Sequence, residues 1–349
     1  MRREIKGDLC HDLLIKKIKP KLAFSPEVDF EEWKDNCKNK LYELLGIDNI
    51  RKNSCPLNLL VEEEERTEEY LKIRFSFESE VGAFVPCYLL VPKGGKKSYP
   101  LAICLQGHTG GFHHSIGELK KESDKIFQPH TAHALQAVKR GYAALAIEQR
   151  AMGERQSPLY PDPTVHACAI NALTAINLGR TTIGERVWDV SRAIDCMSYF
   201  CDCGIDLERI MILGHSGGGT AAYYSTCFDE RIGYSATCGA FCSFEKSIMK
   251  IHHCACNYIP NICNYFEMAD LSCLIAPRRL SVMTGIYDDI FPIDGVEEAF
   301  SAIENIFEKA SCKDKIRLVT SPSGHIFDEE IFWSAIEEET HKMGWNSLK

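Results

Sequence analysis

The stretch that decides the fold is RIMILGHSGGGT, residues 209–220. Its apolar residues 210–213 are typical of a buried strand, and residues 220–224 favour a helix. Between them, Gly214-His215-Ser216-Gly217-Gly218 fits the pattern G-x-S-x-G. A strand, a glycine-rich turn and a helix predict a nucleophile elbow, in which Ser216 stands on a strained corner and the glycines avoid collisions with the strand and the helix. A plain tight turn is the alternative.

On both sides of this stretch, apolar runs alternate with segments of helical periodicity. The runs are typical of parallel strands covered on both faces, and they lie at residues 101–105, 143–147, 208–213, 280–284 and 316–320. Helical spacing recurs over residues 187–201, 296–307 and 331–343. This alternation predicts an α/β fold with a mostly parallel, doubly wound sheet and helices on both faces. Ligands bind such sheets beyond the C-terminal ends of the strands.

Residues 1–60 are predicted to form a helical accessory segment ahead of the main domain at 61–349. Ser25-Pro26 is typical of a helix start, apolar residues recur at helical spacing over 30–44, and Gly46 ends the pattern. We expect this amphipathic helix to pack on the main domain or on a partner, and a lid or a dimer arm is the alternative.

The main domain is expected to begin with one edge of the sheet and to carry two insertions. The acidic run 62–65 is typical of a solvated strand edge, and residues 71–77 and 84–91 predict a strand pair there. Two stretches, 151–182 and 244–277, interrupt the later alternation after predicted strand ends. We expect both to rim the cleft and to shape its pocket.

The composition limits the partners of the chain. A net charge of −9 without a basic patch or tail argues against nucleic acid and anionic membranes as partners. The first residues lack the apolar run of a signal peptide, and no stretch is long and apolar enough for a bilayer, so we expect a cytoplasmic protein. We expect no cofactor.

The seventeen cysteines are odd in number and lie in a long chain, which favours thiols over a disulfide framework. Two C-x-C pairs occur, Cys201/Cys203 and Cys254/Cys256, and the second follows His252-His253. A zinc site at the second pair is an alternative, but its spacing fits no common zinc knuckle. We therefore expect a structural role for these cysteines and no bound metal.

A serine nucleophile needs a base, and the base needs an acid that fixes its tautomer. His325 is the candidate base, because it follows the predicted strand 316–320 and precedes the last helix. His341 lies within that helix and is expected at the surface. For the acid, three carboxylates after the strand 280–284 are open at this point: Asp288, Asp289 and Asp294.

The oxyanion of a tetrahedral intermediate needs fixed hydrogen-bond donors. The backbone N–H of Gly217, the residue after the nucleophile, is one candidate. The other lies in the loop QGHTGG, residues 106–111, where the N–H of His108 is the first choice and that of Thr109 the second. For the His108 side chain, a substrate contact and a structural role in the loop are both open. Further candidates for contact with substrate in the cleft are Thr109, His215, His252 and His253.

These motifs resemble the α/β-hydrolase superfamily, in particular its acetyl xylan esterase-like and dienelactone hydrolase-like enzymes. The resemblance covers residues 80–345, and its motifs are QGHTGG at 106–111, EQRAMGE at 148–154, GHSGG at 214–218, GIYD at 285–288 and GH at 324–325. It implies the triad Ser216, Asp288 and His325, since it puts the acid three residues after the glycine and four before the proline of GIYDDIFP, at Asp288.

The resemblance implies an esterase that works through an acyl-enzyme. Dienelactone hydrolases carry a cysteine at the position of Ser216, so the serine favours ester hydrolysis. The missing export signal disfavours polymeric xylan and favours small or oligomeric acetylated sugars. Glu148 and Arg150 are expected to form an ion pair that braces the cleft, with substrate contact as the alternative. The rival functions are a peptidase or thioesterase of the same fold and a non-catalytic binding protein.

Overall fold

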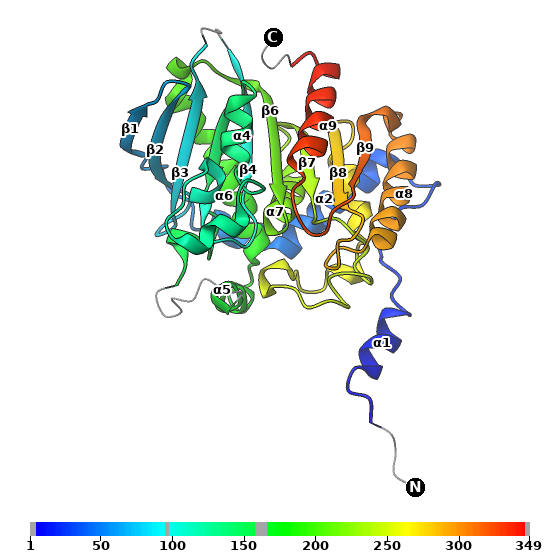
Figure 1. Cartoon of the computed structure of the whole chain (residues 1–349). Helices are drawn as coiled ribbons and strands as arrows, with labels where there is room; N and C mark the ends of the chain where they lie inside the picture. Colours follow the sequence, from blue (N-terminus) through cyan, green and yellow to red (C-terminus); the bar gives the residue numbers. More distant parts are fainter. Residues whose placement is uncertain (1–4, 95–97, 158–165, 346–349) are drawn as a thin grey trace.

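The computed structural model describes residues 5–94, 98–157 and 166–345. Across these residues, nine strands form a single mixed sheet in the spatial order β1-β2-β3-β5-β4-β6-β7-β8-β9 (Figure 1). The strands are β1 (Leu60–Arg66), β2 (Tyr70–Glu78), β3 (Phe84–Pro92), β4 (Tyr99–Leu105), β5 (Ala143–Ile147), β6 (Ile205–His215), β7 (Ile232–Cys238), β8 (Arg279–Gly285) and β9 (Ile316–Ser321).

The larger part of the sheet is parallel, as the alternation of strands and helices predicts. β5, β4, β6, β7, β8 and β9 pair in parallel. β1, β2 and β3 form an antiparallel edge, and β3 joins β5 in antiparallel orientation. The acidic run lies in β1, whose residues are all exposed, so the predicted solvated edge is confirmed. Charges on an exposed edge strand hinder pairing with another chain.

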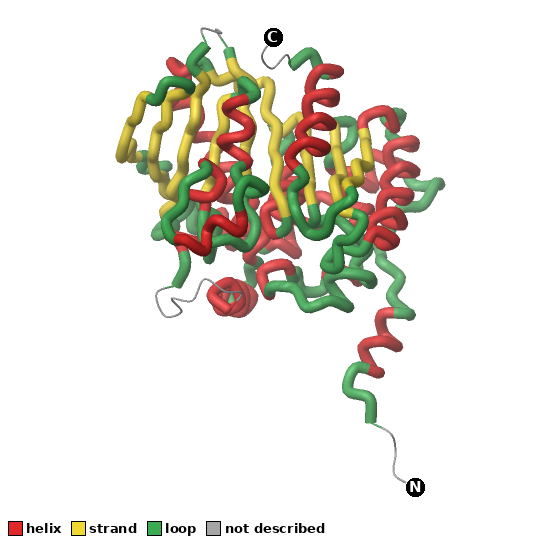
Figure 2. Tube along the Cα trace, in the orientation of Figure 1, coloured by secondary structure: helices red, strands yellow, loops and turns green. Residues whose placement is uncertain are grey.

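Helices cover both faces of this sheet (Figure 2). They are α1 (Leu9–Ile15), α2 (Phe30–Leu45), α3 (Ile47–Arg51), α4 (His133–Lys139), α5 (His166–Asn177), α6 (Thr182–Cys196), α7 (Gly217–Phe228), α8 (Ile293–Lys309) and α9 (Glu329–Lys342). α4 and α9 pack on one face, and α6, α7 and α8 pack on the other.

The central strand β4 shows why the apolar runs are continuous. Ala102 and Cys104 face the core under α4 and α9, whereas Leu101, Ile103 and Leu105 face the core under α6 and α7. All seven residues of β4 are buried, so each side chain avoids water whichever face it occupies. A strand covered on both sides therefore has no polar alternation.

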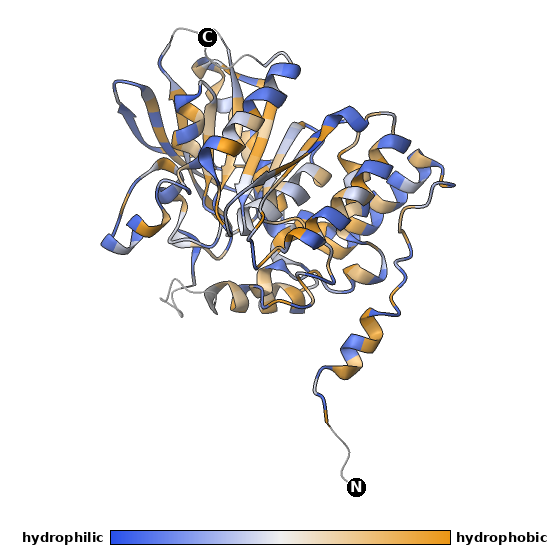
Figure 3. Cartoon of the chain, turned by 45° about the vertical axis from the view of Figure 1, so that its right-hand side comes forward, coloured by the Kyte–Doolittle hydropathy of each residue, from blue (hydrophilic) through white to orange (hydrophobic). Residues whose placement is uncertain are grey.

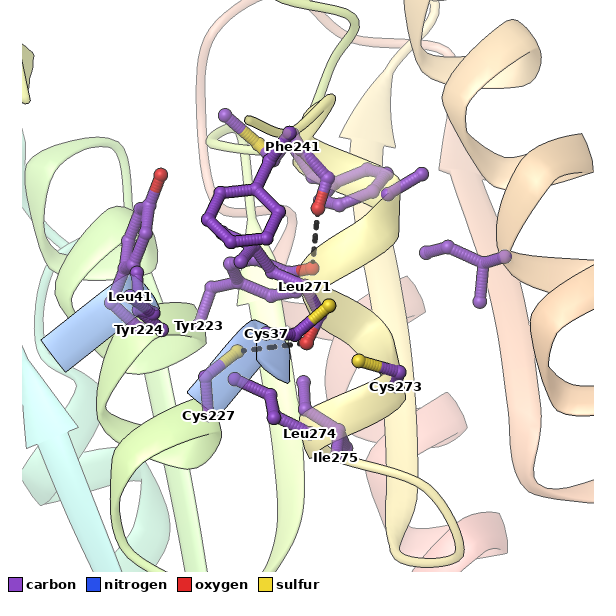
Figure 4. Packing of buried hydrophobic residues seen from close by; sticks show 14 of the residues in the cluster. Cys37, Leu41, Tyr223, Tyr224, Cys227, Phe241, Leu271, Cys273, Leu274 and Ile275 are labelled. Carbon is purple, nitrogen blue, oxygen red and sulfur yellow. Dashed lines mark hydrogen bonds between the residues drawn. The ribbon is translucent and has the colours of Figure 1, made fainter. Parts of the chain in front are cut away.

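α2 packs on the main domain, which confirms that expectation for the accessory helix. Its buried face, with Cys37 and Leu41, lies against Tyr223 and Cys227 of α7 and against the segment 271–275 (Figure 4). The helix does not begin at Ser25-Pro26, however, so the predicted start is wrong. Asp29 is the N-cap, and its carboxylate accepts a hydrogen bond of 3.0 Å from the N–H of Glu32. A carboxylate caps better than a distant serine because it reaches the first turn directly.

Gly46 ends α2, as predicted, and the structure explains why the residue is glycine. Its φ of +74° lies in the left-handed region, and an added Cβ would lie 2.4 Å from the carbonyl oxygen of Gly179. The chain therefore turns directly into α3, and the close approach ties the accessory segment to the connection before α6.

α1 projects away from the rest of the chain (Figure 3). None of its residues is buried, and Leu9, Leu13 and Leu14 are exposed. An ion pair of 2.6 Å between Asp12 and Lys250 connects it to the main domain. In the described part of the chain, no helix combines the length and apolar character that crossing a lipid bilayer requires.

The strand β7 is missing from the sequence-based prediction. Gly233, Ser235 and Thr237 interrupt its apolar residues, so no continuous run marks it. Ser235 and Thr237 are nevertheless fully buried, and their hydroxyls lie 3.2 Å apart. Hydroxyl groups that form hydrogen bonds with one another can occupy core positions in place of aliphatic side chains.

Candidate active site

Ser216 stands at the corner between β6 and α7. Its φ of 56° and ψ of −125° are rare for a residue with a side chain, and its N–H donates a hydrogen bond of 2.9 Å to the carbonyl of Cys238. The flanking glycines are required by space. A Cβ on Gly214 would lie 2.4 Å from Gly218, and a Cβ on Gly218 would lie 2.2 Å from the carbonyl oxygen of Leu105. The strained corner predicted for a nucleophile elbow is therefore present.

Asp288 and His325 form a hydrogen-bonded pair. His325 Nδ1 lies 2.7 Å from Asp288 Oδ2, and the carboxylate is 1% exposed. The other oxygen, Oδ1, accepts hydrogen bonds from the N–H groups of Ile290 at 2.8 Å and Phe291 at 2.9 Å. Because the carboxylate is an acceptor only, His325 must be protonated at Nδ1, which leaves Nε2 as an acceptor.

The two other candidate carboxylates lie elsewhere. Asp289 is exposed next to Asp288 in the chain. Asp294 has a side chain that is 67% exposed and pairs with Lys246 at 3.0 Å. Of the three carboxylates left open by the spacing, Asp288 is the one that contacts the imidazole.

His325 and Ser216 line the same pocket. The imidazole of His325 lies against the ring of His215, with ring centres 4.5 Å apart, and is stacked on Phe291 at 5.9 Å. Among the described residues, Nε2 of His325 has no hydrogen-bond partner, so the bond to the Ser216 hydroxyl is not formed in this structure. Such bonds often shorten only when substrate binds.

The pocket has a volume of about 350 Å³ and opens beside Ser216. Its lining includes six histidines: His108, His130, His215, His252, His253 and His325. The apolar part of the lining consists of Ile126, Phe127, Ile290, Ile326 and Phe327. The candidate contact residues Thr109, His215, His252 and His253 all line this pocket, and their contact with substrate stays a prediction.

The two insertions contribute differently from the expectation. Residues 252–254 and Asn257, from the second insertion, line the pocket, whereas no described residue of the first insertion, 151–157 or 166–182, does so. In their place, residues 126–131 form part of the wall. Sequence reasoning missed this segment, although the long connection between the strands at 101–105 and 143–147 marks it as irregular.

Burial keeps two of the pocket histidines neutral. It lowers the pKa of His253 to about 4 and holds the pKa of His215 well below its ordinary value. His253 Nε2 lies 2.9 Å from the hydroxyl of Ser247. These imidazoles therefore offer hydrogen bonds without charge at neutral pH.

Glu148 and Arg150 do not form the expected ion pair, and neither lines the pocket. Glu148 accepts hydrogen bonds from the Gln106 side chain at 2.7 Å and from the N–H groups of Phe112 and Glu154. Burial raises the pKa of Glu148 to about 7. The two residues lie near one another in the chain, but Glu148 braces the loop 106–111.

Arg150 belongs to a buried charge network instead. Its guanidinium contacts Asp189 at 2.9 Å and Glu80 at 2.7 Å, and Arg155 contacts Asp189 at 2.7 Å. Burial alone would raise the pKa of Asp189, but Arg150 and Arg155 lower it to about 2. This network replaces the single pair that the sequence suggested.

Two groups of side chains in the described residues could hold a metal ion. One joins His113, His114 and Asp124, but the Asp124 carboxylate already accepts hydrogen bonds from two backbone N–H groups and contacts His113. The other joins an imidazole to three thiols, namely His108, Cys168, Cys254 and Cys256. The sequence did not reveal this group, because His108 and Cys168 lie far from the C-x-C pair Cys254/Cys256 in the chain.

No disulfide joins cysteines within the described part of the chain. The ring of His108 lies over Gly217, since a Cβ on that glycine would come within 2.8 Å of His108 Cε1. His108 therefore contacts both the nucleophile corner and the thiol group, and its contact with substrate stays a prediction.

Residues 4–225, more than half of the chain, match the Abhydrolase family. The chain belongs to the Abhydrolase family. The matched part of this Abhydrolase family protein includes the loop 106–111 and Ser216, and it ends before Asp288 and His325.

Relatives of this Abhydrolase family protein agree with the assignment. It is 24% identical over 299 residues to "Putative hydrolase YtaP" of Bacillus subtilis (strain 168), covering 82% of this chain and 92% of that one. Its structure is similar to that of a "putative acetyl xylan esterase" of Bacteroides fragilis NCTC 9343, with a TM-score of 0.78, 16% identity and coverage of 96% and 95%.

A glucuronoyl esterase from Solibacter usitatus matches with a TM-score of 0.67, 15% identity and coverage of 95% of this chain and 100% of that one. At these identities the solved structures show the fold, which is the α/β-hydrolase fold implied by the motifs. The narrower resemblance to dienelactone hydrolases stays a prediction.

Proposed function

We propose that this protein is a serine esterase that cleaves carboxylic esters through an acyl-enzyme. The observation that carries the proposal is the hydrogen bond between Asp288 and His325, because His325 lines the pocket that also holds Ser216 on its strained corner. In a catalytic triad the carboxylate fixes the imidazole with Nδ1 protonated, so that Nε2 accepts the proton of the serine.

The reaction would proceed in two halves. Ser216 Oγ attacks the acyl carbon while His325 Nε2 takes its proton, and the N–H groups of Gly217 and His108 receive the oxyanion. A single donor of this kind lowers the barrier by about 2.7–4 kcal/mol. The alcohol then leaves with the proton from His325, and water attacks the acyl-enzyme with His325 as base, which releases the acid and restores Ser216.

The chemistry of the pocket wall favours an uncharged substrate. Among the described residues that line it, none is Lys, Arg, Asp or Glu. Burial keeps His215 and His253 neutral, so they suit hydroxyl groups rather than ions. The structural relatives named above are a "putative acetyl xylan esterase" and a glucuronoyl esterase. We therefore propose acetyl esters of small or oligomeric sugars as substrates.

The test compares p-nitrophenyl acetate hydrolysis and acetate release from acetylated sugars in the wild type and in Ser216→Ala. We expect the variant to lose a factor of about 10³–10⁶ in kcat, as hydrolases do when the nucleophile is removed. Ser225→Ala is a matched control, because this buried serine lies on α7 and its hydroxyl has no hydrogen-bond partner among the described residues. Equal rates in wild type and Ser216→Ala would exclude the proposal.

The same preparation separates the rival functions. A fluorophosphonate probe should label Ser216 in the wild type and leave Ser216→Ala unlabelled, whereas a non-catalytic binding protein would react in neither form. Acetyl thioesters and peptide amides belong in the substrate panel as well. Faster turnover of either than of acetylated sugars would favour a thioesterase or a peptidase of this fold.

A further inference from the structure

Three thiols and one imidazole meet beside the pocket. The Nε2 or Nδ1 atom of His108 and the sulfurs of Cys168, Cys254 and Cys256 all lie within 4.8 Å of one another. His108 Nε2 is already 3.2 Å from the sulfur of Cys256. We propose that these four side chains bind one Zn²⁺ ion in a closed, structural site.

The donor set and its spacing both fit zinc. Cys₃His is one of the tetrahedral sets that hold structural zinc, with Zn–S near about 2.3 Å and Zn–N near about 2.0–2.1 Å. Such a tetrahedron would place neighbouring sulfurs about 3.7 Å apart, so the ligand atoms need to contract by about 1 Å at most. Four protein ligands fill the coordination shell, which leaves no position for a reactive water and indicates a structural role.

The charge of the surroundings fits the same ion. Arg186 is 2% exposed, and its guanidinium donates hydrogen bonds to the sulfurs of Cys256 at 3.3 Å and Cys168 at 3.2 Å. In the described part of the chain it forms no salt bridge with a carboxylate, although a buried cation needs a compensating negative charge. Zn²⁺ with three thiolates and a neutral imidazole carries a net charge of −1, which balances Arg186.

The buried charge network beside Arg186 does not supply this balance. Asp189, Glu80 and Glu185 are matched there by three arginines, Arg150, Arg155 and Arg180. Within the described residues, Arg186 contacts that group through the carbonyl oxygen of Arg150, at 3.0 Å, and through no carboxylate. Its charge is therefore directed at the sulfurs.

The four ligands come from three segments that are far apart in the sequence. His108 follows β4, and Cys168 lies on α5. Cys254 precedes and Cys256 lies within the short helical turn Ala255–Asn257, which contacts α5, in the yellow region of Figure 1. Among the described residues, the apolar cluster that joins α5 to the rest is small, and its buried members are the three cysteines, Ala151, Met152 and Ala172. Because this cluster buries little apolar surface, it stabilises the position of α5 only weakly. A bound metal ion would add binding free energy that stabilises this position.

The ion would also fix the loop 106–111. The Nδ1 edge of His108 faces Gly217, because a Cβ there would lie 2.9 Å from Nδ1. A metal on Nε2 would hold the ring, and with it the backbone N–H that we propose as an oxyanion donor. In metal sites, contacts on the other edge of a bound imidazole help the ion to fix the orientation of the ring.

The first test uses metal content and Co²⁺ as a probe. Chain purified without chelator should contain one zinc per molecule, and Co²⁺ added to the metal-stripped chain should give the intense visible bands of tetrahedral Co²⁺ and a thiolate-to-cobalt charge-transfer band that saturate at one equivalent. Binding should release protons, because every ligand thiol that is protonated in the metal-stripped chain must lose its proton to the buffer. A wild-type chain that contains no zinc and gives no such bands with Co²⁺ would overturn the proposal.

Variants then assign the ligands. Cys168→Ser and Cys254→Ser should each weaken Co²⁺ binding at least about tenfold. Cys201→Ser is the matched control, since Cys201 is exposed and lies outside the group, and it should bind as the wild type does. Full retention of the Co²⁺ bands in both ligand variants would also overturn the proposal. Circular dichroism separates lost ligation from lost folding, and the wild-type titration does not depend on the variants.

The zinc proposal and the esterase proposal fail separately. Ser216→Ala should lose ester hydrolysis and keep its zinc, because Ser216 does not belong to the ligand set. A chain without metal could still hydrolyse esters, and a chain with metal could be inactive, so metal content decides this inference alone.

Discussion

Replacement of Asp288 by Asn tests the proposed role of this carboxylate without changing its size. Oδ1 accepts hydrogen bonds from two backbone N–H groups, of Ile290 and Phe291, while Oδ2 accepts from His325. In Asp288→Asn the amide oxygen must face the two backbone donors, because the amide NH₂ would clash with both. The NH₂ group therefore points at His325 and donates to its Nδ1.

This reversal changes the tautomer of the base. His325 must then accept at Nδ1 and carry its proton on Nε2, where it can no longer accept the proton of Ser216. The corresponding change in a serine protease lowers kcat about 10⁴-fold. A loss of that size corresponds to about 5.4 kcal/mol in the barrier, at 1.36 kcal/mol for each factor of ten.

The assay is steady-state hydrolysis of p-nitrophenyl acetate near pH 7. We expect kcat to fall about 10⁴-fold and KM to change little, because the substitution leaves the shape of the pocket intact. Asp289→Asn is the matched control and should keep the wild-type rate. Asp289 is exposed and, among the described residues, forms no hydrogen bond or ion pair with His325, whose partner is Asp288. A loss below tenfold in Asp288→Asn, or an equal loss in Asp289→Asn, would refute the assignment of Asp288.

Two further predictions concern stability and follow from buried charges. Burial raises the pKa of Glu148 to about 7, so the stability contributed by its protonated form is complete below pH 4.5 and is lost as the pH rises through 7. Urea unfolding should show the wild type losing about 3 kcal/mol over this range relative to Glu148→Gln, and parallel pH profiles would contradict this. Asp189→Asn should cost about 3–5 kcal/mol at neutral pH, because Arg150 and Arg155 would lose their shared counter-charge. A cost below about 1 kcal/mol in the same assay would show that these arginines find other partners.

The sheet could be predicted from the sequence because its strands are buried on both faces. All residues of a strand such as β4 are buried, so its sequence is a continuous apolar run that can be recognised without the structure. β7 could not be predicted from an apolar run, because its buried positions include Ser235 and Thr237, whose hydroxyls are hydrogen-bonded to one another. The start of α2 was misplaced because a serine and a proline fit a helix start as well as Asp29 does, and the choice depends on contacts along the fold.

The candidate site was predictable where its residues lie next to one another in a motif. Ser216 and the loop 106–111 carry such motifs, and His325 follows from its place after a strand. Asp288 and Asp289 are adjacent residues of the same type, so the sequence cannot distinguish them. In the structure Asp288 is buried and Asp289 is exposed. The ion pairs of Arg150 could not be predicted, because its partners Glu80 and Asp189 lie far from it in the sequence.

The two sides of the pocket differ in what holds them. Ser216, Asp288 and His325 follow strands of the sheet, and the main core fixes their backbone through contacts such as the bond from Ser216 N–H to Cys238. His108 follows a strand as well, but its ring depends on the small group around Cys256 and Cys168. The position of His108, whose N–H is the proposed second oxyanion donor, is therefore the part of the site that the apolar core determines least. If zinc occupies that group, the ion replaces the missing core, and its loss should lower kcat while Asp288 and His325 keep their contact.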